Sequence, residues 1–545
     1  MKRTILFFSF IGCWIVMFSQ NQICVDCNSS SSESGTSSSP YHTIQKAVNN
    51  AVSGDVIKVA KGIYSEAVKI KNKKVQLLGG FAGNGDFSSA NPQTNKTTIK
   101  GTSDAPCILV SITSDISGLL IINGFTICEG ERGIELADGW SQFMDNVKIE
   151  NNIIENNGNV SKVGGGIGIG GGNITIQNNT IRNNKAKRGA AIGRTNRMDN
   201  FSIADNLIQD NTSYDDHAGG LDIHGTGTVT RNIFERNRAA EGLGYGWGGA
   251  ILITNEGYPD RLITLSHNIY RNNHAPDHGG AVFVDDEAHV RMEHELFYNN
   301  TCNKSGSAIY VDIAGDAGPP STLYMSNCTV YGNSATNGAA MFVEGSIAQV
   351  ENCIFWNNGN DFETVYKGQA AVLTVNYTLT QQGFAGTGNF SSDPLFANPS
   401  NGDFHLKSKG GRFLNGEWVN DDVTSPAIDA GNPSSPFSNE PTPNGSRINL
   451  GYYGNTAEAS KSADVGIEEL SLESGALKIY PNPTTGELKI KNYELKIENI
   501  EIFDVYGRQI FNFQFSTFNS IDVSGLPTGV YFVRVGNRMA KFVKQ

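Results

Sequence analysis

An asparagine recurs at one fixed place in eight similar segments between residues 147 and 358. Each segment has an apolar residue, three variable positions in which Asn is frequent, a second apolar residue, and Asn three positions later. The closing asparagines are Asn157, Asn184, Asn211, Asn237, Asn273, Asn300, Asn333 and Asn358, so successive copies are 25 to 36 residues apart. Such a period is typical of a solenoid, whose units bury their apolar faces only by stacking on one another. Asn is a poor helix former, but its amides can hydrogen-bond along a stack of strands. The repeat therefore predicts a parallel β-helix.

Seven glycine-rich segments alternate with the asparagine segments and predict a second part of each coil. They span residues 164–170, 189–195, 218–224, 248–254, 279–285, 306–312 and 338–344. In each segment, small residues permit a tight corner, and a short run of alternating apolar residues follows, as in a strand with one buried face. Each coil should therefore hold at least two strands and two corners. With coils about 4.8 Å apart, eight of them make a rod roughly 35–40 Å long.

The first twenty residues have the pattern of a secretory signal peptide. Lys2 and Arg3 precede an apolar run from Ile5 to Phe18, which is too short and too weakly flanked for a membrane anchor. No other stretch approaches the length that spans a bilayer. We expect residues 1–20 to be removed, residues 21–39 to form a serine-rich tail, and the mature protein to be exported and soluble.

The C-terminal part of the chain differs in pattern from the repeats. A polar linker is expected over 455–464, and residues 465–545 contain short apolar runs separated by Pro and Gly turns, which predicts a small β-sandwich. The segments Tyr480–Pro483, Gly486, Asp504 and Leu526–Tyr531 closely resemble the C-terminal sorting domain of the type IX secretion system of Bacteroidetes. The resemblance implies that this machinery carries the chain across the outer membrane and that the domain is removed. The protein would then be attached to the surface of the Gram-negative cell or released.

Two further resemblances concern the ends of the predicted rod. Residues 37–81 resemble the N-terminal cap of pectate-lyase-like right-handed β-helices, in which a short amphipathic helix covers the first coil; the apolar positions here are Ile44, Ala47, Val48 and Ala51. Residues 392–454 resemble the choice-of-anchor Q module, which follows β-helices in exported bacterial proteins and would close the rod. Together the resemblances imply a right-handed parallel β-helix over residues 40–391. The phrases at 234–237 and 249–251 also resemble chlamydial polymorphic outer-membrane proteins, which are surface adhesins.

Composition excludes one class of partner. The chain of 545 residues has a net charge of −12 and only 18% charged residues, so it lacks the basic surface that a nucleic-acid binder requires for phosphate contacts. The acidic excess suits an extracellular protein and can supply calcium ligands.

Two pairs of cysteines need an interpretation. Cys24 and Cys27 lie in the predicted tail and indicate a local disulfide or no specific role. Cys328 and Cys353 occupy the repeat position at which earlier coils carry Asn, so stacking would bring them within disulfide range. A pair of free thiols in the core is the alternative.

Alignment of the glycine-rich segments predicts two columns of outward-facing side chains. The first contains Asp222, Leu252, Phe283, Tyr310 and Phe342, and the second contains His224, Thr254, Asp285, Asp312 and Glu344. Large apolar side chains facing outward on four coils are unusual unless they bind a ligand. Aromatic rings beside carboxylates are typical of a sugar-binding groove. The alternative is that a loop or the segment 360–455 covers the rings.

Seven of the nine histidines lie between residues 217 and 294. His267 and His294 share one repeat position, so we expect them to stack in or beside the asparagine ladder in a structural role. His224, His274 and His278 are the histidines for which a functional role is the more plausible.

A polysaccharide lyase neutralises a uronate carboxylate, removes a proton with a base, and protonates the leaving oxygen with an acid. Asp285, Asp286 and Glu287 are candidate calcium ligands. Arg271 or Arg291 is the candidate neutralising group or base, and His274, His278 or Tyr310 is the candidate acid. In a glycoside hydrolase, which is the less favoured reading, Asp285 would work with Asp312 or Asp222.

The signature phrases of polygalacturonases and pectate lyases are missing, so the sequence leaves catalysis open. The hypothesis is an exported protein that interacts with a polysaccharide or a cell-surface glycan. The predicted substrate-binding residues are Asp222, His224, Phe283, Tyr310, Phe342 and Glu344. The alternative is a non-catalytic surface adhesin or structural β-helix protein.

Overall fold

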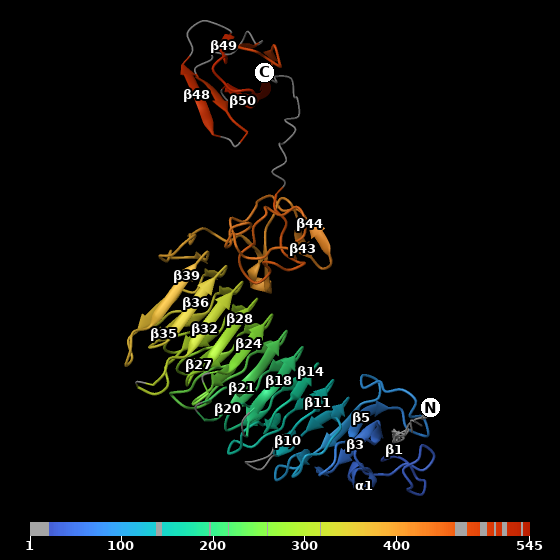
Figure 1. The fold of residues 1–545 in the computed structure, drawn as a ribbon. Helices are drawn as coiled ribbons and strands as arrows, with labels where there is room; N and C mark the ends of the chain where they lie inside the picture. Colours follow the sequence, from blue (N-terminus) through green and yellow to red (C-terminus); the bar gives the residue numbers. More distant parts are fainter. Residues whose placement is uncertain are drawn as a thin grey trace, which may run out of the picture. The chain divides into compact units, whose positions relative to one another are not determined.

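The computed structural model describes residues 21–137, 144–195, 198–215, 217–258, 260–316, 318–463, 477–490, 499–505, 508–514, 520–535 and 538–545. The predicted signal peptide, residues 1–20, lies outside the described residues. The chain forms two compact units, and the boundary between them follows Ala463 (Figure 1). The first unit is a right-handed parallel β-helix, as the repeats and the resemblance together predicted. Within the described part of the chain, no helix has the length and apolar character needed to cross a membrane.

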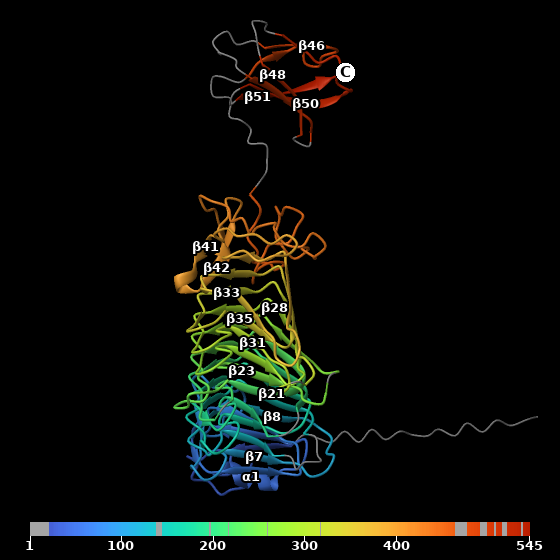
Figure 2. The ribbon, with the colours of Figure 1, turned by 90° about the vertical axis from the view of Figure 1, so that its left-hand side faces the viewer.

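Each coil of the first unit contributes strands to three parallel sheets, whose stacking Figure 2 shows from the side. Sheet I contains the strands of the seven glycine-rich segments, which are β13 (Ile167–Ile169), β17 (Ile192–Arg194), the first half of β21 (Leu221–Thr230), β23 (Ile251–Thr254), β27 (Val282–Asp285), β31 (Ile309–Val311) and β35 (Met341–Glu344). It also contains β4 (Val68–Lys71), β7 (Ile108–Ser111) and β10 (Ile134–Ala137) before them and β38 (Phe362–Val365) after them.

Sheet II follows sheet I in each coil and is joined to it through β21, which runs through the corner without a break. Its other strands are β1 (Gln22–Val25), β2 (Val56–Ala60), β5 (Gln76–Phe81), β8 (Leu120–Asn123), β11 (Val147–Glu150), β14 (Ile174–Gln177), β18 (Met198–Ala204), β24 (Leu262–Ser266), β28 (His289–Glu293), β32 (Thr322–Ser326), β36 (Ile347–Glu351) and β39 (Val372–Asn376).

Sheet III is made of short strands, most of which lie between the two asparagine positions of a repeat. They are β3 (Gly62–Ser65), β6 (Thr97–Lys100), β9 (Thr126–Cys128), β12 (Ile153–Glu155), β15 (Thr180–Arg182), β19 (Leu207–Gln209), β22 (Ile233–Glu235), β25 (Ile269–Arg271), β29 (Leu296–Tyr298), β33 (Thr329–Tyr331), β37 (Ile354–Trp356) and β40 (Leu379–Thr380). Their middle residues point inward, so the rings of Phe234, Tyr270 and Phe297 stack in the core at centroid distances of 5.1 and 4.5 Å.

Between sheet III and the next strand of sheet I, the chain makes a third corner that carries very short strands. These pair as β16 (Lys185–Ala186) with β20 (Thr212–Ser213), and as β26 (His274–Ala275) with β30 (Thr301–Cys302) and β34 (Ser334–Ala335). The third corner was not predicted.

The asparagine ladder is confirmed, and it is double. In one ladder, Asn237 Nδ2 donates to Asn273 Oδ1 at 3.1 Å, and Asn273 Nδ2 donates to Asn300 Oδ1 at 2.9 Å. The second ladder runs at the other turn of sheet III from Asn152 to Asn268. All of these side chains are buried, and each ladder satisfies amide and backbone groups at turns that water does not reach.

The second ladder changes its chemistry after Asn268. Glu295 takes the next place and accepts from the Asn268 backbone N–H and Nδ2, both at 3.1 Å. Cys328 and Cys353 follow as adjacent buried free thiols, with the Cys328 backbone nitrogen 3.3 Å from Cys353 Sγ. Of the two alternatives for this pair, the structure therefore contains the free thiols.

The N-terminal cap is built as expected, but the predicted serine-rich tail is wrong. Helix α1 (Ile44–Asn50) begins after Thr43, whose side chain caps it, and buries Ile44, Ala47 and Val48. Strand β1 pairs in parallel with β2 and so belongs to the β-helix. Its apolar residues Cys24 and Val25 are buried, because an uncovered first coil would leave core and strand edge in water. The Cys24 and Cys27 thiols are free.

The segment after the last coil covers a side of the rod as well as following its end. It holds β41 (Phe396–Asn398), the 3-10 helix η1 (Pro399–Asn401), β42 (Asp403–Leu406), β43 (Arg412–Leu414) and β44 (Glu417–Val419). Phe396, Phe404 and Leu450 pack on outward residues of β29, β33 and β37. Residues 455–463 also pack here, with Ala459 and Ser460 buried, so the predicted linker over 455–464 is wrong for this stretch.

The second unit consists of two antiparallel sheets. One contains β45 (Ile479–Tyr480), β46 (Glu487–Ile490) and β49 (Ser520–Asp522), and the other contains β47 (Asn499–Phe503), β48 (Gln509–Gln514), β50 (Gly529–Val535) and β51 (Arg538–Lys544). Leu488, Val533 and Phe542 are buried in its core. This is the small β-sandwich that the sequence predicted.

Candidate functional site

The first predicted surface column of sheet I lies in register but is buried. Leu252, Phe283, Tyr310 and Phe342 are on consecutive strands, and their exposed fractions are 1, 2, 3 and 6%. The three rings stack at centroid distances of 4.9 Å. The predicted open aromatic groove is therefore wrong, and the alternative of a covering segment is correct.

The third corner supplies much of the cover. The Trp247 ring lies 5.9 Å from Phe283, and the His278 ring lies 4.4 Å from Tyr310. Gly279 has a φ of +65°, and a Cβ there would stand 2.9 Å from the Phe283 Cβ. Glycine thus allows the corner to fold back over the strand that follows it. Alternation along the strand could not reveal this contact.

We expect Tyr310→Ala to act on stability rather than on ligand binding. The ring is buried between Phe283 and Phe342, and removal of a buried aromatic side chain costs about 3–5 kcal/mol. Urea denaturation followed by circular dichroism should show this loss in the β-helix unit. If the variant instead keeps wild-type stability and loses affinity for a glycan, the ring is accessible after all.

The second predicted column ends in a compact polar network. Lys367 Nζ donates to both oxygens of Asp312 at 2.9 and 3.0 Å and lies 3.7 Å from Glu344. The Tyr310 hydroxyl donates to Glu344 at 2.5 Å. Lys367 was not predicted as a site residue, because it lies beyond the last repeat and reaches this column only by the turn after β38.

Burial raises the pKa values of the two aspartates in this network to different extents. It raises the pKa of Asp285 to about 8, with help from the charges of Asp286 and Asp312. It raises the pKa of Asp312 to about 6, against the hydrogen bonds from Lys367. At neutral pH, Asp285 is therefore a neutral acid beside an ionised Asp312. Such a pair has the protonation states of a general acid and a general base, but its side chains are largely covered.

The remaining predicted residues do not join this network into one catalytic set. Asp222 is 2% exposed and is paired with Arg194 at 3.1 Å. His224 is buried, and its ring lies 5.6 Å from Tyr258. Arg271 is on sheet III, where it binds Glu235 and the Tyr298 hydroxyl, each at 3.1 Å. The predicted grouping of Arg271 with Asp285, His278 and Asp312 is therefore wrong.

Two of the histidine contacts join neighbouring coils. His267 and His294 stack at a centroid distance of 4.7 Å, as expected. His274 Nδ1 lies 2.9 Å from the Thr301 hydroxyl of the next coil. His278 is 3.7 Å from Asp277, and burial lowers its pKa.

The structure gives the predicted calcium site no support. Asp286 and Glu287 form a tight turn with φ values of 49° and 60° after the half-buried Asp285. Among the described residues, no group of three His, Cys, Asp or Glu side chains is arranged to hold a metal ion.

An exposed face that the sequence interpretation missed lies on the outside of sheet III. Its central column, which we call the stripe, consists of Ile153, Thr180, Leu207, Ile233 and Ile269, in register on five successive coils. All five are half-buried or exposed, and Ile153 is 37% exposed. The stripe with its flanking residues is called the stripe face below. The next outward residue in the same column, Leu296, is covered by the segment around Phe404.

Two pockets lie at the ends of the stripe. One, of about 580 Å³, is lined by Pro92, Asn123, Ile153 and Thr180. The other, of about 440 Å³, is lined by Ile233, Ile269, Tyr452 and Glu458. The stripe face is therefore bounded at one end by the loop around Pro92 and at the other by residues 452–458. With coils about 4.8 Å apart, the five coils span roughly 20 Å.

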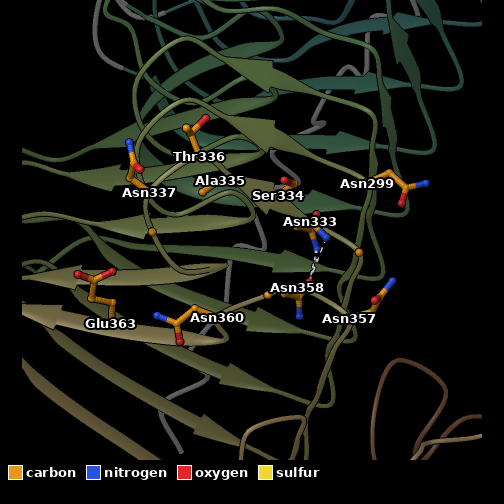
Figure 3. A pocket seen from close by; sticks show the side chains of 13 residues that line it. Asn299, Asn333, Ser334, Ala335, Thr336, Asn337, Asn357, Asn358, Asn360 and Glu363 are labelled. Atoms are coloured by element: carbon orange, nitrogen blue, oxygen red, sulfur yellow. Dashed lines mark hydrogen bonds between the residues drawn. The ribbon is translucent and has the colours of Figure 1, made fainter.

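A third pocket, of about 560 Å³, opens beside the last coils (Figure 3). It lies beside β34, which is an edge strand of its small sheet. The side chains of Ser334, Thr336, Asn337, Asn360 and Glu363 stand around it (Figure 3). It offers hydrogen bonds but little apolar surface.

Comparison with known families identifies the second unit. Residues 478–545 match the secretion system C-terminal sorting domain. The protein is therefore exported by the type IX secretion system, to the cell surface or the medium of a Bacteroidetes-type bacterium, as the sequence predicted. Within the first unit, residues 27–243 match a family described as protein of unknown function (DUF1565), and residues 327–431 match one described as disaggregatase related. The choice-of-anchor Q resemblance stays a prediction.

Among solved structures, similar chains include a pectate lyase (Pel9A; 13% identity, TM-score 0.36, covering 80% of this chain and 97% of that one). Another is XylC in complex with xylose (13%, 0.38, 69% and 87%). A third is an alginate lyase from Paenibacillus sp. str. FPU-7 (16%, 0.31, 61% and 96%). No curated protein matches the chain.

Proposed function

We propose that this exported protein binds a polysaccharide through the stripe face of sheet III without cleaving it. The observation that carries the proposal is the stripe itself, in which Ile153, Thr180, Leu207, Ile233 and Ile269 point outward in line on five coils. Such a row of partly exposed, mostly aliphatic side chains on five coils needs a reason, and a ligand is the more economical one.

The shape of the stripe suits a sugar chain better than a protein surface. The apolar column is one residue wide and is flanked on both sides by polar residues, such as Asn178 and Arg182 beside Thr180. A pyranose ring has apolar C–H faces and a rim of hydroxyl groups, which match that alternation. A stable protein interface needs a broad apolar centre of several hundred Å².

The network around Asp312 supports catalysis less well. Asp312 is 9% exposed and bonded to Lys367, and the Tyr310 hydroxyl is bonded to Glu344. A polymer would have to displace these contacts to reach the carboxyl groups. Hydrolysis remains a second candidate function only because Asp285 and Asp312 carry different protonation states at neutral pH.

Replacement of Leu207 by Asp, at the middle of the stripe, should lower affinity for the polysaccharide by at least about tenfold, which corresponds to about 1.4 kcal/mol. The matched control is Thr228→Asp, which places the same charge at an exposed position on sheet II. The measurement is the retardation of the mature protein in native gels that contain single polysaccharides, with release of reducing ends and unsaturated products followed in parallel.

Retardation of the wild type and of Thr228→Asp, lost in Leu207→Asp, would support the proposal. Equal retardation of both variants would move the site away from the stripe. Product release that Asp312→Asn abolishes would establish the catalytic alternative instead.

A further inference from the structure

We propose that the polysaccharide on the stripe face is uncharged and lies along the axis of the rod, with about one sugar residue per coil. This inference rests on the proposed function and adds to it the chemical class and the direction of the ligand. Coils repeat about every 4.8 Å, which is close to the length of one pyranose unit in an extended chain.

The charges beside the stripe cancel one another from coil to coil. Arg182 pairs with Glu155 at 2.6 Å, and Arg271 pairs with Glu235 at 3.1 Å. At the two turns that border the strands, Arg231 pairs with Asp205 and Arg236 pairs with Asp210, each at 2.7 Å. Each arginine therefore has a carboxylate of the preceding coil as its partner.

This pairing matters for the ligand more than for stability. Exposed ion pairs contribute little to the free energy of unfolding, but they remove the free guanidinium groups that an anionic sugar would need. The stripe and the outward positions that flank it on the same five coils contain no lysine. Burial and the neighbouring His294 also lower the pKa of His267, so this side chain adds no positive charge at neutral pH. A net charge of −12 on the whole chain further disfavours a polyanion.

Neutral hydrogen-bonding groups remain available for sugar hydroxyls. Asn151 and Asn178 are exposed at the turn that precedes the stripe residue, and Gln209 lies beside Leu207. The stripe can contact the C–H faces of the sugar rings, while the flanking amides and ion pairs form hydrogen bonds with the sugar hydroxyl groups. None of the five stripe residues is aromatic, so no single one can bind a sugar ring strongly. Affinity should therefore increase with the number of sugar residues, up to about the five that span the stripe.

The test compares neutral polymers (xylan, galactomannan, mixed-linkage β-glucan) with anionic ones (polygalacturonate, alginate) in the same gels. We expect the wild type to be retarded by a neutral polymer, with less than about a twofold change between low and high salt, because no unpaired charge contributes. The double variant Glu155→Gln, Glu235→Gln removes the partners of Arg182 and Arg271. It should gain salt-sensitive retardation by the anionic polymers.

The control double variant Glu241→Gln, Glu293→Gln removes the partners of Arg238 and Arg291 on other faces of the rod. It should not gain that binding. Retardation of the wild type by the anionic polymers and not by the neutral ones would overturn this inference while leaving the proposed function intact. Absence of retardation by every polymer would overturn both. Independence of affinity from oligosaccharide length would overturn the axial arrangement.

Discussion

Replacement of Asn237 by Ala is expected to lower the free energy of unfolding of the β-helix by about 3–5 kcal/mol. Asn237 Nδ2 donates to the Ile208 carbonyl at 2.8 Å and to Asn273 Oδ1 at 3.1 Å. Its Oδ1 accepts from the backbone N–H and the Nδ2 of Asn211 at 3.2 and 3.0 Å. The variant leaves these partners buried without Asn237, and each unpaired buried group costs about 1–3 kcal/mol.

Urea denaturation measures this loss, and Gln209→Ala is its control. Gln209 is two residues before Asn211, on the outside of the same coil of sheet III. Surface substitutions of that kind change stability by less than about 0.5 kcal/mol. An equal shift of the denaturation midpoint in both variants would show that the ladder bonds do not contribute more than an average contact.

Replacement of Glu295 by Gln is expected to remove a large part of the pH dependence of stability. Glu295 is fully buried in the second ladder, and burial raises its pKa to about 8. Burial outweighs the hydrogen bonds that Glu295 accepts from Asn268, which by themselves would favour the carboxylate.

The sign of the effect follows from the raised pKa. In the unfolded chain, the group ionises near its ordinary value of about 4.3. Between that pH and about 8, unfolding releases a proton, so the free energy of unfolding falls as the pH rises. The contribution is complete below the ordinary value and is lost by pH 8. At about 1.4 kcal/mol per pH unit, the loss amounts to roughly 3–5 kcal/mol.

The measurement is the urea midpoint of the wild type and of Glu295→Gln at several values between pH 4 and pH 9. The two proteins should be similar at pH 4, and the Gln variant should be the more stable at pH 8. Glu295→Asp is the comparison variant, because it keeps an ionisable group in the ladder and should keep a pH dependence. Parallel curves for the wild type and the Gln variant would mean that Glu295 is not protonated in the folded chain.

Much of the fold could be predicted because the structural repeat of a solenoid appears as a repeat of the amino-acid sequence. Residues one repeat apart become neighbours on adjacent coils, so the stacks of Asn273 on Asn237 and of His294 on His267 follow from spacing alone. The C-terminal sandwich was also predictable from a local pattern of apolar residues and turns, and the cap around Ile44 was expected from the resemblance to pectate-lyase-like β-helices. The repeat did not predict the role of Glu295, because the residue type changes there while the ladder position stays the same.

The open and covered faces of the rod could not be predicted in the same way. Outward orientation follows from alternation along a strand, but exposure depends on which distant segment packs on that strand. Trp247 and His278 fold over Phe283 and Tyr310, which buried the predicted groove.

The sequence by itself determined a parallel β-helix with an asparagine ladder, because these depend on its period, and its resemblances to known families indicated the capped first coil and the secretion domain. Only the tertiary structure decided where a ligand can bind. The third corner covers sheet I, and the segment around Phe404 covers Leu296 and packs against the half-buried Ile269, but it leaves the coils before Ile269 open. These contacts join segments that no repeat relates, so their energies depend on three-dimensional packing.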